Sequence, residues 1–475
     1  MNNKKIIFFI TLSFFLSIII SLNFVNKLDV YESDGLDHHI IKGDIDTIWS
    51  KGAKFKNDLI LGESFLVSGA EMLRSYLPPR LIGLFSIIFD YELLTNDEDL
   101  TKISIGFTKF YYLLFQSLIF YVTIYYFHQK LLYISKNDKV SFATILFLCF
   151  CPNIFIYNSS FHTESIFFSI QLLLLALLAF PRQSIFYNLI IGVVVSLLFL
   201  QKTVGIFYII LVIGYLSIIY KKKSFKLIPF VILIYVFTLT SIGYGNYKRM
   251  GVFYFMPTQG NDAVHHYLAE NILRDSQKFS NNEVSQKIYN DLNNWKVENG
   301  IKNIVVNKNP LKISENNIEE QNRLKINKFK KDYTLDLIKE YPISTFKIMT
   351  WKALQSLILD PVYIFHYHFN EQDLKQKPQW YMKKSYSNFW TPIKIVYSIL
   401  IYFIIFLGFF YSLRRLELTF NLLLITSALY MFLMLGWVGN HRYLLPSLIY
   451  LSIYFGYGLQ YLFNLNLSKR INLIK

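Results

Sequence analysis

The apolar residues of this chain are collected in blocks of about 20 residues, which is the length of helix that crosses the hydrocarbon core of a bilayer. Short charged strings separate these blocks. A single soluble core cannot bury so many of them, and the hydrophobic share of 53% exceeds the roughly 45–50% of soluble domains. The pattern therefore predicts an all-α polytopic membrane protein.

About ten transmembrane helices are expected from these blocks. The predicted spans cover residues 6–26, 104–127, 140–157, 164–180, 184–200, 204–220, 227–244, 391–413, 418–438 and 443–462. Residues 77–89 are too few to cross. Residues 346–365 include Lys347, Lys352 and Asp360, each of which would cost about 2.5–3.5 kcal/mol near a helix centre. We expect both stretches at the membrane interface.

The orientation follows from the cations in alternate loops, because cytoplasmic loops carry an excess of Lys and Arg. One set of loops and both ends of the chain hold most of them: Lys4, Lys5, Lys130, Lys136, Lys139, Arg182, Lys221, Lys222, Lys223, Lys226, Arg414, Arg415, Lys469, Arg470 and Lys475. The short loops on the opposite side contain only Lys202 and Arg442. Both termini are therefore expected in the cytoplasm, and the net charge of +16 requires no nucleic-acid partner.

Two further observations concern the membrane. Residues 6–26 are followed by no Ala-x-Ala-like cleavage site, so we expect an uncleaved first span instead of a signal peptide. The Asn-, Ile-, Lys- and Phe-rich composition is typical of AT-rich bacterial genomes. It favours a bacterial inner membrane, with membrane lipids as constant partners.

The spans divide the chain into three parts. Residues 1–245 contain spans one to seven and an outer loop over residues 27–103 with interfacial helices, and residues 391–475 contain spans eight to ten. Residues 246–390 form a polar extracytoplasmic segment between spans seven and eight, long enough to be a small domain. We expect this segment to be mixed or α-helical.

The flanks of that segment carry the clearest helix signal. Residues 262–274 and 333–351 have helix-like apolar spacing. Residues 291–327 are so polar that we expect part of them to be mobile.

The first outer loop begins with a dense acidic run. Residues 31–39 directly follow span one and carry the carboxylates of Glu32, Asp34 and Asp37. Ionisable groups at the membrane are candidates for function. A transferase whose hydroxyl or amine acceptor attacks a sugar carbon needs a carboxylate to accept the proton or to orient the nucleophile. The alternative interpretation is a solvated acidic loop that simply ends a span.

A second carboxylate, Glu164, stands at the outer start of span four. The functional interpretation places it in the same cavity as the acidic run. The alternative is that Thr163 caps the helix and that Glu164 complements the positive end of its dipole, which is worth about 0.3–1 kcal/mol.

Three basic residues lie at outer ends of other spans. Lys202 occupies a very short turn after span five, and His441 and Arg442 precede span ten. Arginine and lysine can hold a lipid-linked phosphate, the first by a forked contact and the second as a point charge. The alternative is that these side chains snorkel to headgroups.

The order of these motifs resembles the GT-C superfamily of polytopic glycosyltransferases, closest to its bacterial protein-mannosyltransferase and aminoarabinose-transferase branch. Four stretches carry the resemblance: 32–35 (Glu-Ser-Asp-Gly), 76–80 (Tyr-Leu-Pro-Pro-Arg), 161–165 (Phe-His-Thr-Glu-Ser) and 441–446 (His-Arg-Tyr-Leu-Leu-Pro). The resemblance extends over most of the chain in layout. In motif it covers only these short stretches and the end of the large outer segment.

This resemblance implies a role for each matching position. Asp34 would be the catalytic acidic residue, Glu164 a supporting carboxylate, and Lys202 and Arg442 contacts to the carrier phosphate. Rival carboxylates surround Asp34: Glu32, Asp37, Asp44 and Asp46. The implied donor is a polyprenyl-phosphate sugar, the reaction inverts the anomeric carbon, and the acceptor is a lipid, a glycan or a protein. Some branches bind a divalent metal and others do not; the spacing here requires no metal or other cofactor.

Other functions share part of this pattern. An O-antigen ligase or polymerase would use the same location and carrier chemistry. A lipid-linked-sugar flippase or other transporter would also have many spans, but usually with internal repeats or Gly/Pro-broken helices at the midplane, and the sequence shows neither clearly. A non-catalytic envelope scaffold is a third alternative.

Overall fold

The computed structural model describes residues 3–33, 45–66, 75–89, 107–159, 163–256, 264–301, 313–359, 384–435 and 444–472. All regular secondary structure in these ranges is helical. This confirms the predicted fold class of an all-α membrane protein.

The helices outside residues 264–356 follow the predicted blocks, with two exceptions. In chain order they are α1 (Asn3–Ser33), α2 (Ile45–Ile60), α3 (Leu77–Phe89), α5 (Phe107–Ser135), α6 (Asp138–Phe150), α7 (Pro152–Asn158), α8 (Glu164–Ala179), α9 (Ile185–Gln201), α10 (Tyr208–Tyr220), α11 (Ser224–Met250), α19 (Lys384–Ser412), α20 (Leu418–Leu435) and α21 (Leu445–Asn472). The exceptions are α2 and α3, which fall in the predicted outer loop over residues 27–103. The stretch predicted over 77–89 forms α3 with the same bounds.

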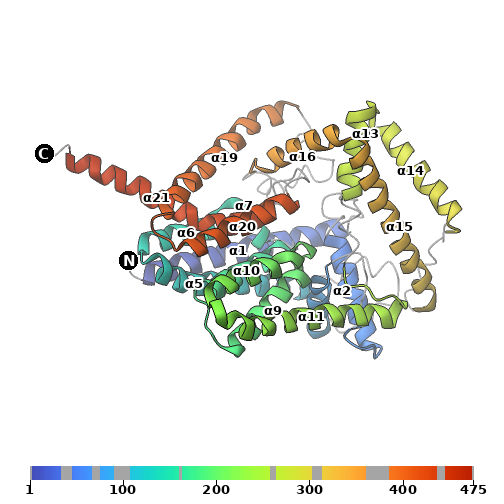
Figure 1. Ribbon diagram of the computed structural model, residues 1–475, viewed down its shortest axis with the longest axis horizontal. Coiled ribbons are helices and arrows are strands. Elements are labelled where there is room, and N and C mark those ends of the chain that lie inside the picture. Colours follow the sequence, from blue (N-terminus) through green and yellow to red (C-terminus); the bar gives the residue numbers. More distant parts are fainter. Residues whose placement is uncertain are drawn as a thin grey trace.

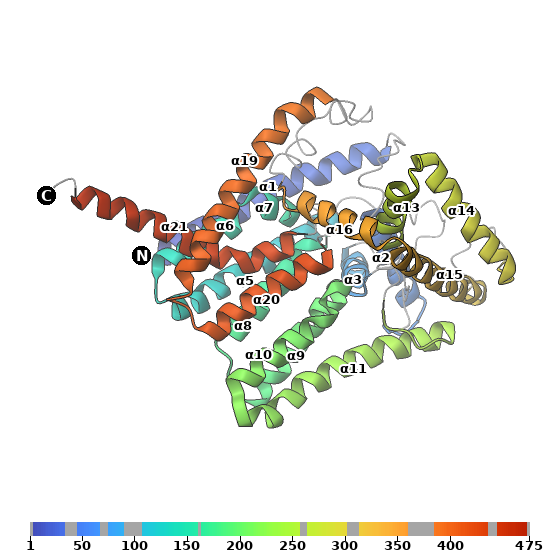
Figure 2. The same ribbon diagram turned by 45° about the horizontal axis from the view of Figure 1, so that its top comes forward.

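Within the described ranges, four helical stretches are long and apolar enough to cross a membrane, or five if one bent pair is counted as a span. They are Lys4–Leu22, Thr108–Ser135, Thr203–Arg249 and Thr391–Ser412, with α6 and α7 as the bent pair. Helices α3, α8, α9 and α20 are apolar but shorter. Inside the third stretch, Lys221 has a positive φ of 50°. The chain turns there, and α10 and α11 diverge from that corner (Figure 2). The count of about ten spans stays a prediction.

The bundle occupies one side of the molecule, with the start of α1 and the end of α21 at the left of Figures 1 and 2. Its core is continuous, and buried side chains from α5, α6, α8, α9, α20 and α21 contribute to it. Helix α19 packs along α21, and α5 packs against both α1 and α8.

The pairing of α19 with α21 depends on close backbone approach. A Cβ atom added at Gly408 would overlap the carbonyl oxygen of Tyr454, and one at Gly458 would overlap the carbonyl oxygen of Ile404. Small residues allow such contact between membrane helices, where packing replaces the hydrophobic effect as the main attraction.

The span predicted over 140–157 is not straight. It divides into α6 and α7, which are bent by 57° at Cys151. Pro152 opens α7 and Cys151 has extended backbone angles, as expected before a proline, whose ring disfavours a helical neighbour. The carbonyl of Cys149, near the end of α6, accepts a hydrogen bond from the Ser13 hydroxyl at 2.7 Å. The thiols of Cys149 and Cys151 are free and buried.

At the other side of the molecule lies a group of helices that we call the 264–356 cluster (Figure 1). It contains η3 (His265–Ala269, a π-helix), α13 (Glu270–Gln277), α14 (Asn281–Glu298), α15 (Ile313–Glu340) and α16 (Pro342–Ser356). Its own small core is formed by Leu268, Ala269, Ile272, Leu273, Val284, Leu337 and Ile348. The domain boundaries at 245 and 390 stay a prediction.

Candidate functional site

Glu164 is the first residue of α8, and its side chain is completely buried. Of the capping alternative, the position of Glu164 in the first turn of α8 agrees with a role at the helix dipole, but the cap by Thr163 is wrong. Thr163 stands at the N-cap, but its side chain makes no capping hydrogen bond to the helix. Its hydroxyl lies instead 3.5 Å from a carboxylate oxygen of Glu164, at the limit of a hydrogen bond.

Lys202 caps the far end of α9 and reaches the same carboxylate. Its Nζ lies 2.8 Å from Glu164 Oε1, and its side chain is 16% exposed. The ammonium also lies 5.7 Å from the centre of the Phe167 ring, one turn further along α8. The structure therefore brings together two of the residues that the sequence singled out.

The chain topology explains this meeting. Helices α8 and α9 are consecutive and pack against each other, so the first residue of α8 comes close to the last residue of α9. A second contact fixes the same corner: the Gln201 side-chain amide donates to the carbonyl of Thr163 at 2.9 Å. Beyond Lys202 the chain turns through a short 3-10 helix, Thr203–Phe207, in which Gly205 lies directly against the backbone of Leu198.

A buried polar network holds the start of α8 in place. The Ser165 hydroxyl donates to Asn158 Oδ1 at 2.6 Å, and Asn158 Nδ2 donates to Ser17 Oγ at 3.1 Å. Ser17 Oγ is also 3.0 Å from the hydroxyl of Ser159. The end of the broken α6–α7 pair is thereby tied to both α1 and α8.

Helix α1 contributes a row of serines to this network. Ser13, Ser17 and Ser21 are spaced four residues apart, so they lie on one face of the helix. Ser13 pairs with the hydroxyl of Tyr121 at 2.7 Å, and Ser21 donates to the carbonyl of Ser159 at 3.1 Å. Unsatisfied polar groups in hydrocarbon cost several kcal/mol, so these bonds are expected to fix α1, α7 and α8 in one arrangement.

The other predicted site residues cannot be placed in the same way. Asp34, Asp37, His441 and Arg442 lie outside the described residues, and so do Asp44 and His162. Glu32 belongs to the last turn of α1, with only its backbone described. The structure thus shows Glu164 and Lys202 in contact. That Asp34 and Arg442 join them around one pocket stays a prediction.

Sequence reasoning gave no role to another set of basic residues. These buried cations belong to α2, α3, α5 and α11: Lys51, Lys56, Arg80, Lys109 and Arg249. Arg80 is the best defined of them, with its guanidinium 3.2 Å from the centre of the Tyr76 ring and Nη1 donating to the Tyr76 carbonyl at 3.0 Å. Burial lowers the pKa of Arg80 to about 10, Tyr76 opposes that shift, and the nearby charge of Arg249 adds to it. The sequence signal that could have pointed to Arg80 is the Pro78-Pro79-Arg80 motif.

Two other features of the described residues bear on the chemistry. No group of three or more His, Cys, Asp and Glu side chains there could hold a metal ion.

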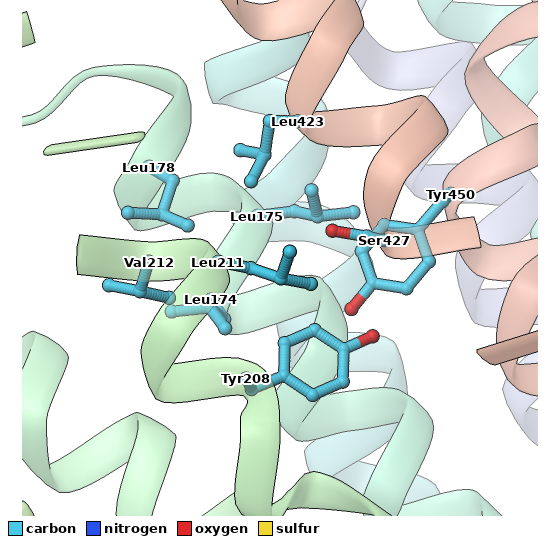
Figure 3. Close-up of a pocket in the computed structure, with 9 residues that line it drawn as sticks. All are labelled: Leu174, Leu175, Leu178, Tyr208, Leu211, Val212, Leu423, Ser427 and Tyr450. Carbon is cyan, nitrogen blue, oxygen red and sulfur yellow. The ribbon is translucent and has the colours of Figure 1, made fainter. Parts of the chain in front are cut away.

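A small apolar cavity lies deeper in the bundle (Figure 3). Gln171 donates hydrogen bonds to two tyrosine hydroxyls at its edge, those of Tyr208 and Tyr450. Its lining residues are Leu174, Leu175, Leu178, Tyr208, Leu211, Val212, Leu423, Ser427 and Tyr450. Neither Glu164 nor Lys202 lines it.

No family model matches the chain, and no curated protein matches it. Among solved structures, the chain is similar to the archaeal oligosaccharyltransferase AglB from Archaeoglobus fulgidus, in a complex with an inhibitory peptide and a dolichol-phosphate. The sequence identity is 11% and the TM-score 0.41, and the match covers 90% of this chain and 48% of that one. The chain thus spans about half the length of that protein. A similarity at this TM-score shows neither the fold nor the activity of this chain.

Proposed function

We propose that this chain is a membrane glycosyltransferase that moves a sugar from a polyprenyl-phosphate carrier to a lipid, glycan or protein acceptor at the outer face of a bacterial inner membrane. The order of the four sequence motifs supports this proposal. The observation that carries it is the Glu164–Lys202 pair, a buried carboxylate held on a lysine at the predicted outer ends of two spans. Charged groups at membrane depth are expensive and mark functional sites by default.

In the proposed reaction, Asp34 accepts the proton of the acceptor hydroxyl or amine. The nucleophilic oxygen or nitrogen bonds to the anomeric carbon as the bond from that carbon to the phosphate oxygen breaks. The electron pair of that bond leaves with the polyprenyl phosphate. Lys202 and Arg442 offset the negative charge that grows on this leaving group, and His441 adds a contact beside Arg442. Glu32 and Asp37 are the rival positions for the base.

The geometry of the pair refines the role of Glu164. A lysine ammonium has three N–H donors, so Lys202 can donate to Glu164 and to a phosphate oxygen together. The Lys202 side chain is 16% exposed and that of Glu164 is 0% exposed, so an anion reaches the pair from the lysine side. Glu164 therefore acts as a positioning residue that aims the ammonium.

The test is transfer of a radiolabelled sugar by the purified full chain in detergent, with a polyprenyl-phosphate monosaccharide as donor. Asp34→Asn should lower the transfer rate at least about 100-fold, the usual contribution of a general base. Glu32→Gln and Asp37→Asn are matched controls from the same loop and should retain most of the activity. Near-normal transfer by a well-folded Asp34→Asn variant would contradict the assignment, and a loss confined to either control would move the base to that residue.

The break between α6 and α7 favours a second candidate function, a flippase or other transporter. Discontinuous helices near the membrane midplane are typical of transporters, and this break lies beside Ser13 in the apolar span of α1. A transporter would move the lipid-linked sugar across proteoliposomes without transferring the label to an acceptor. Transfer of the label to an acceptor in detergent would support the transferase, whereas movement of the label across proteoliposomes without such transfer would support the transporter.

An O-antigen ligase or polymerase differs in its donor. Such an enzyme would use a diphosphate-linked oligosaccharide, whereas the proposed enzyme uses a monophosphate-linked monosaccharide. Offering both donors to the purified chain distinguishes them.

A further inference from the structure

Helix α16 exposes a stripe of large apolar side chains. Ile343, Phe346, Trp351 and Leu354 are 52–84% exposed. Their spacing places them on one side of the helix. Exposed apolar groups that are contiguous in this way mark an interaction surface.

The opposite side of α16 is already occupied. Thr345 and Ile348 are buried, and Ile348 belongs to the core of the 264–356 cluster. Lys347 lies within the stripe, four residues from both Ile343 and Trp351, and its Nζ is 2.5 Å from Asp275 Oδ1 on α13. The helix is therefore fixed to the cluster by one face and presents the apolar stripe with the other.

The chain that follows α16 shows where the end of this helix lies along α19. The backbone N–H of Leu359 donates to the Ser398 hydroxyl of α19 at 2.8 Å, and both residues are buried. Ser398 lies inside the apolar stretch Thr391–Ser412, about two turns or roughly 10 Å from its beginning. The chain three residues beyond the end of α16 therefore meets α19 inside its apolar stretch, and α16 lies between α19 and α13 in both views (Figures 1 and 2).

We propose that the apolar stripe of α16 lies in the outer leaflet of the membrane, covered by lipid headgroups and the upper parts of the acyl chains. Three observations select lipid as the occupant. Helix α19, which the chain beyond α16 contacts at Ser398, also exposes large apolar side chains such as Val396 and Ile399. Trp351 is of the type enriched at membrane interfaces. Lys347 lies within the stripe, but its ammonium extends to Asp275 on α13, so only its apolar stem is left to the lipid, as expected for a snorkelling lysine.

This contact would fix the whole 264–356 cluster at a defined height above the membrane. The inference does not depend on the proposed transferase activity, because it concerns only the placement of α16.

The experiment uses the full chain in proteoliposomes, with both native cysteines, which are buried, replaced by alanine. A spin label is attached at Phe346→Cys or at Leu354→Cys, and its collision rates with oxygen and with a water-soluble nickel complex are measured. The matched control is Val297→Cys on α14, which replaces another highly exposed apolar residue. We expect the ratio of oxygen to nickel accessibility to be several-fold higher at both α16 positions than at the control.

Equal ratios at all three positions would overturn the proposal. Broadening of the α16 spectra that disappears on dilution with unlabelled protein would also overturn it, because a second copy would then cover the stripe. A second measurement covers the case in which the cysteine variants do not fold. Brominated lipids should quench part of the tryptophan fluorescence, and Trp351→Phe should reduce that part; unchanged quenching in this variant would refute the placement.

Discussion

The ion pair at the end of the bundle and the ion pair of the 264–356 cluster have similar geometry and different surroundings. Lys202 and Glu164 join the ends of α9 and α8 at 2.8 Å, and Lys347 and Asp275 join α16 and α13 at 2.5 Å. The first pair has side chains that are 16% and 0% exposed, and the second has side chains that are 66% and 23% exposed. Distance alone would rank the second pair as the stronger.

Burial reverses that ranking when one partner is removed. An exposed lysine or carboxylate that loses its partner is solvated by water, so exposed pairs contribute about 0.2–1 kcal/mol. A buried charge that loses its partner keeps the cost of desolvation, and breaking a buried pair costs about 3–5 kcal/mol. The comparison teaches that the bundle end is sensitive to single charge changes, whereas the cluster relies on apolar packing and local helix signals.

The largest effect is expected for Glu164→Ala. This change removes the buried carboxylate that the Lys202 ammonium contacts, so we expect the free energy of unfolding to fall by about 3–5 kcal/mol, or somewhat less because Lys202 is partly exposed. The apparent midpoint of thermal unfolding in detergent measures it. Glu417→Ala, an exposed glutamate next to α20, is the control and should change the midpoint little.

A double variant separates stability from function at the same site. Glu164→Gln combined with Lys202→Met removes both charges and should recover most of the lost stability, because a buried pair is not better than a neutral pair of similar volume. Under the proposed function the double variant stays inactive in sugar transfer. Full activity in that variant would show that the pair is purely structural.

Much of the fold could be predicted from the sequence, because strong periodic signals decide helix positions. The apolar blocks gave α5, α8, α9 and α19, and the predicted turn between 220 and 227 contains the corner at Lys221. The bend at Cys151 was missed, although the following Pro152 is a known breaker, because uninterrupted apolar residues dominated the reading of 140–157. The start of α14 was not predicted either, although Ser280 and Glu283 mark it as a capping box.

The candidate site could be predicted only where it depends on helices that follow each other in the sequence. Glu164 and Lys202 are the outer ends of consecutive antiparallel helices, so the span prediction already brought them close. Their direct contact, and the absence of a Thr163 cap, depend on side-chain rotamers that no sequence pattern specifies. The buried network through Ser17 and Asn158 was not predicted either, because a row of serines on an apolar helix has no unique partner until the helices are packed.

A smaller effect is expected from the cap of α14, in the region that relies on local signals. The Ser280 hydroxyl accepts a hydrogen bond from the backbone N–H of Glu283 at 3.4 Å. Ser280→Ala should cost about 1 kcal/mol of local stability, and hydrogen exchange in the first turns of α14 should accelerate about fivefold. Ser280→Asp keeps a capping oxygen and is the matched control. Equal acceleration in both variants would mean that the side-chain cap contributes nothing here.

The smallest effect is expected at the exposed ion pair, where pH provides the test. The hydrogen bond from Lys347, followed by one from Ser344, holds the pKa of Asp275 below its ordinary value of 3.8. Because the folded-state pKa is lowered, the contribution is complete above the unfolded-state value and is lost as the pH falls through the folded-state value. Asp275→Asn should therefore reduce stability by about 0.5 kcal/mol or less at pH 7, since solvent screens the pair, and by progressively less as the pH falls below 3.8. The difference in thermal midpoint between variant and wild type, followed from pH 7 to pH 2, measures this.

A loss at pH 7 as large as that of Glu164→Ala would mean that burial does not decide the strength of the two pairs. The contrast between bundle and cluster would then fail.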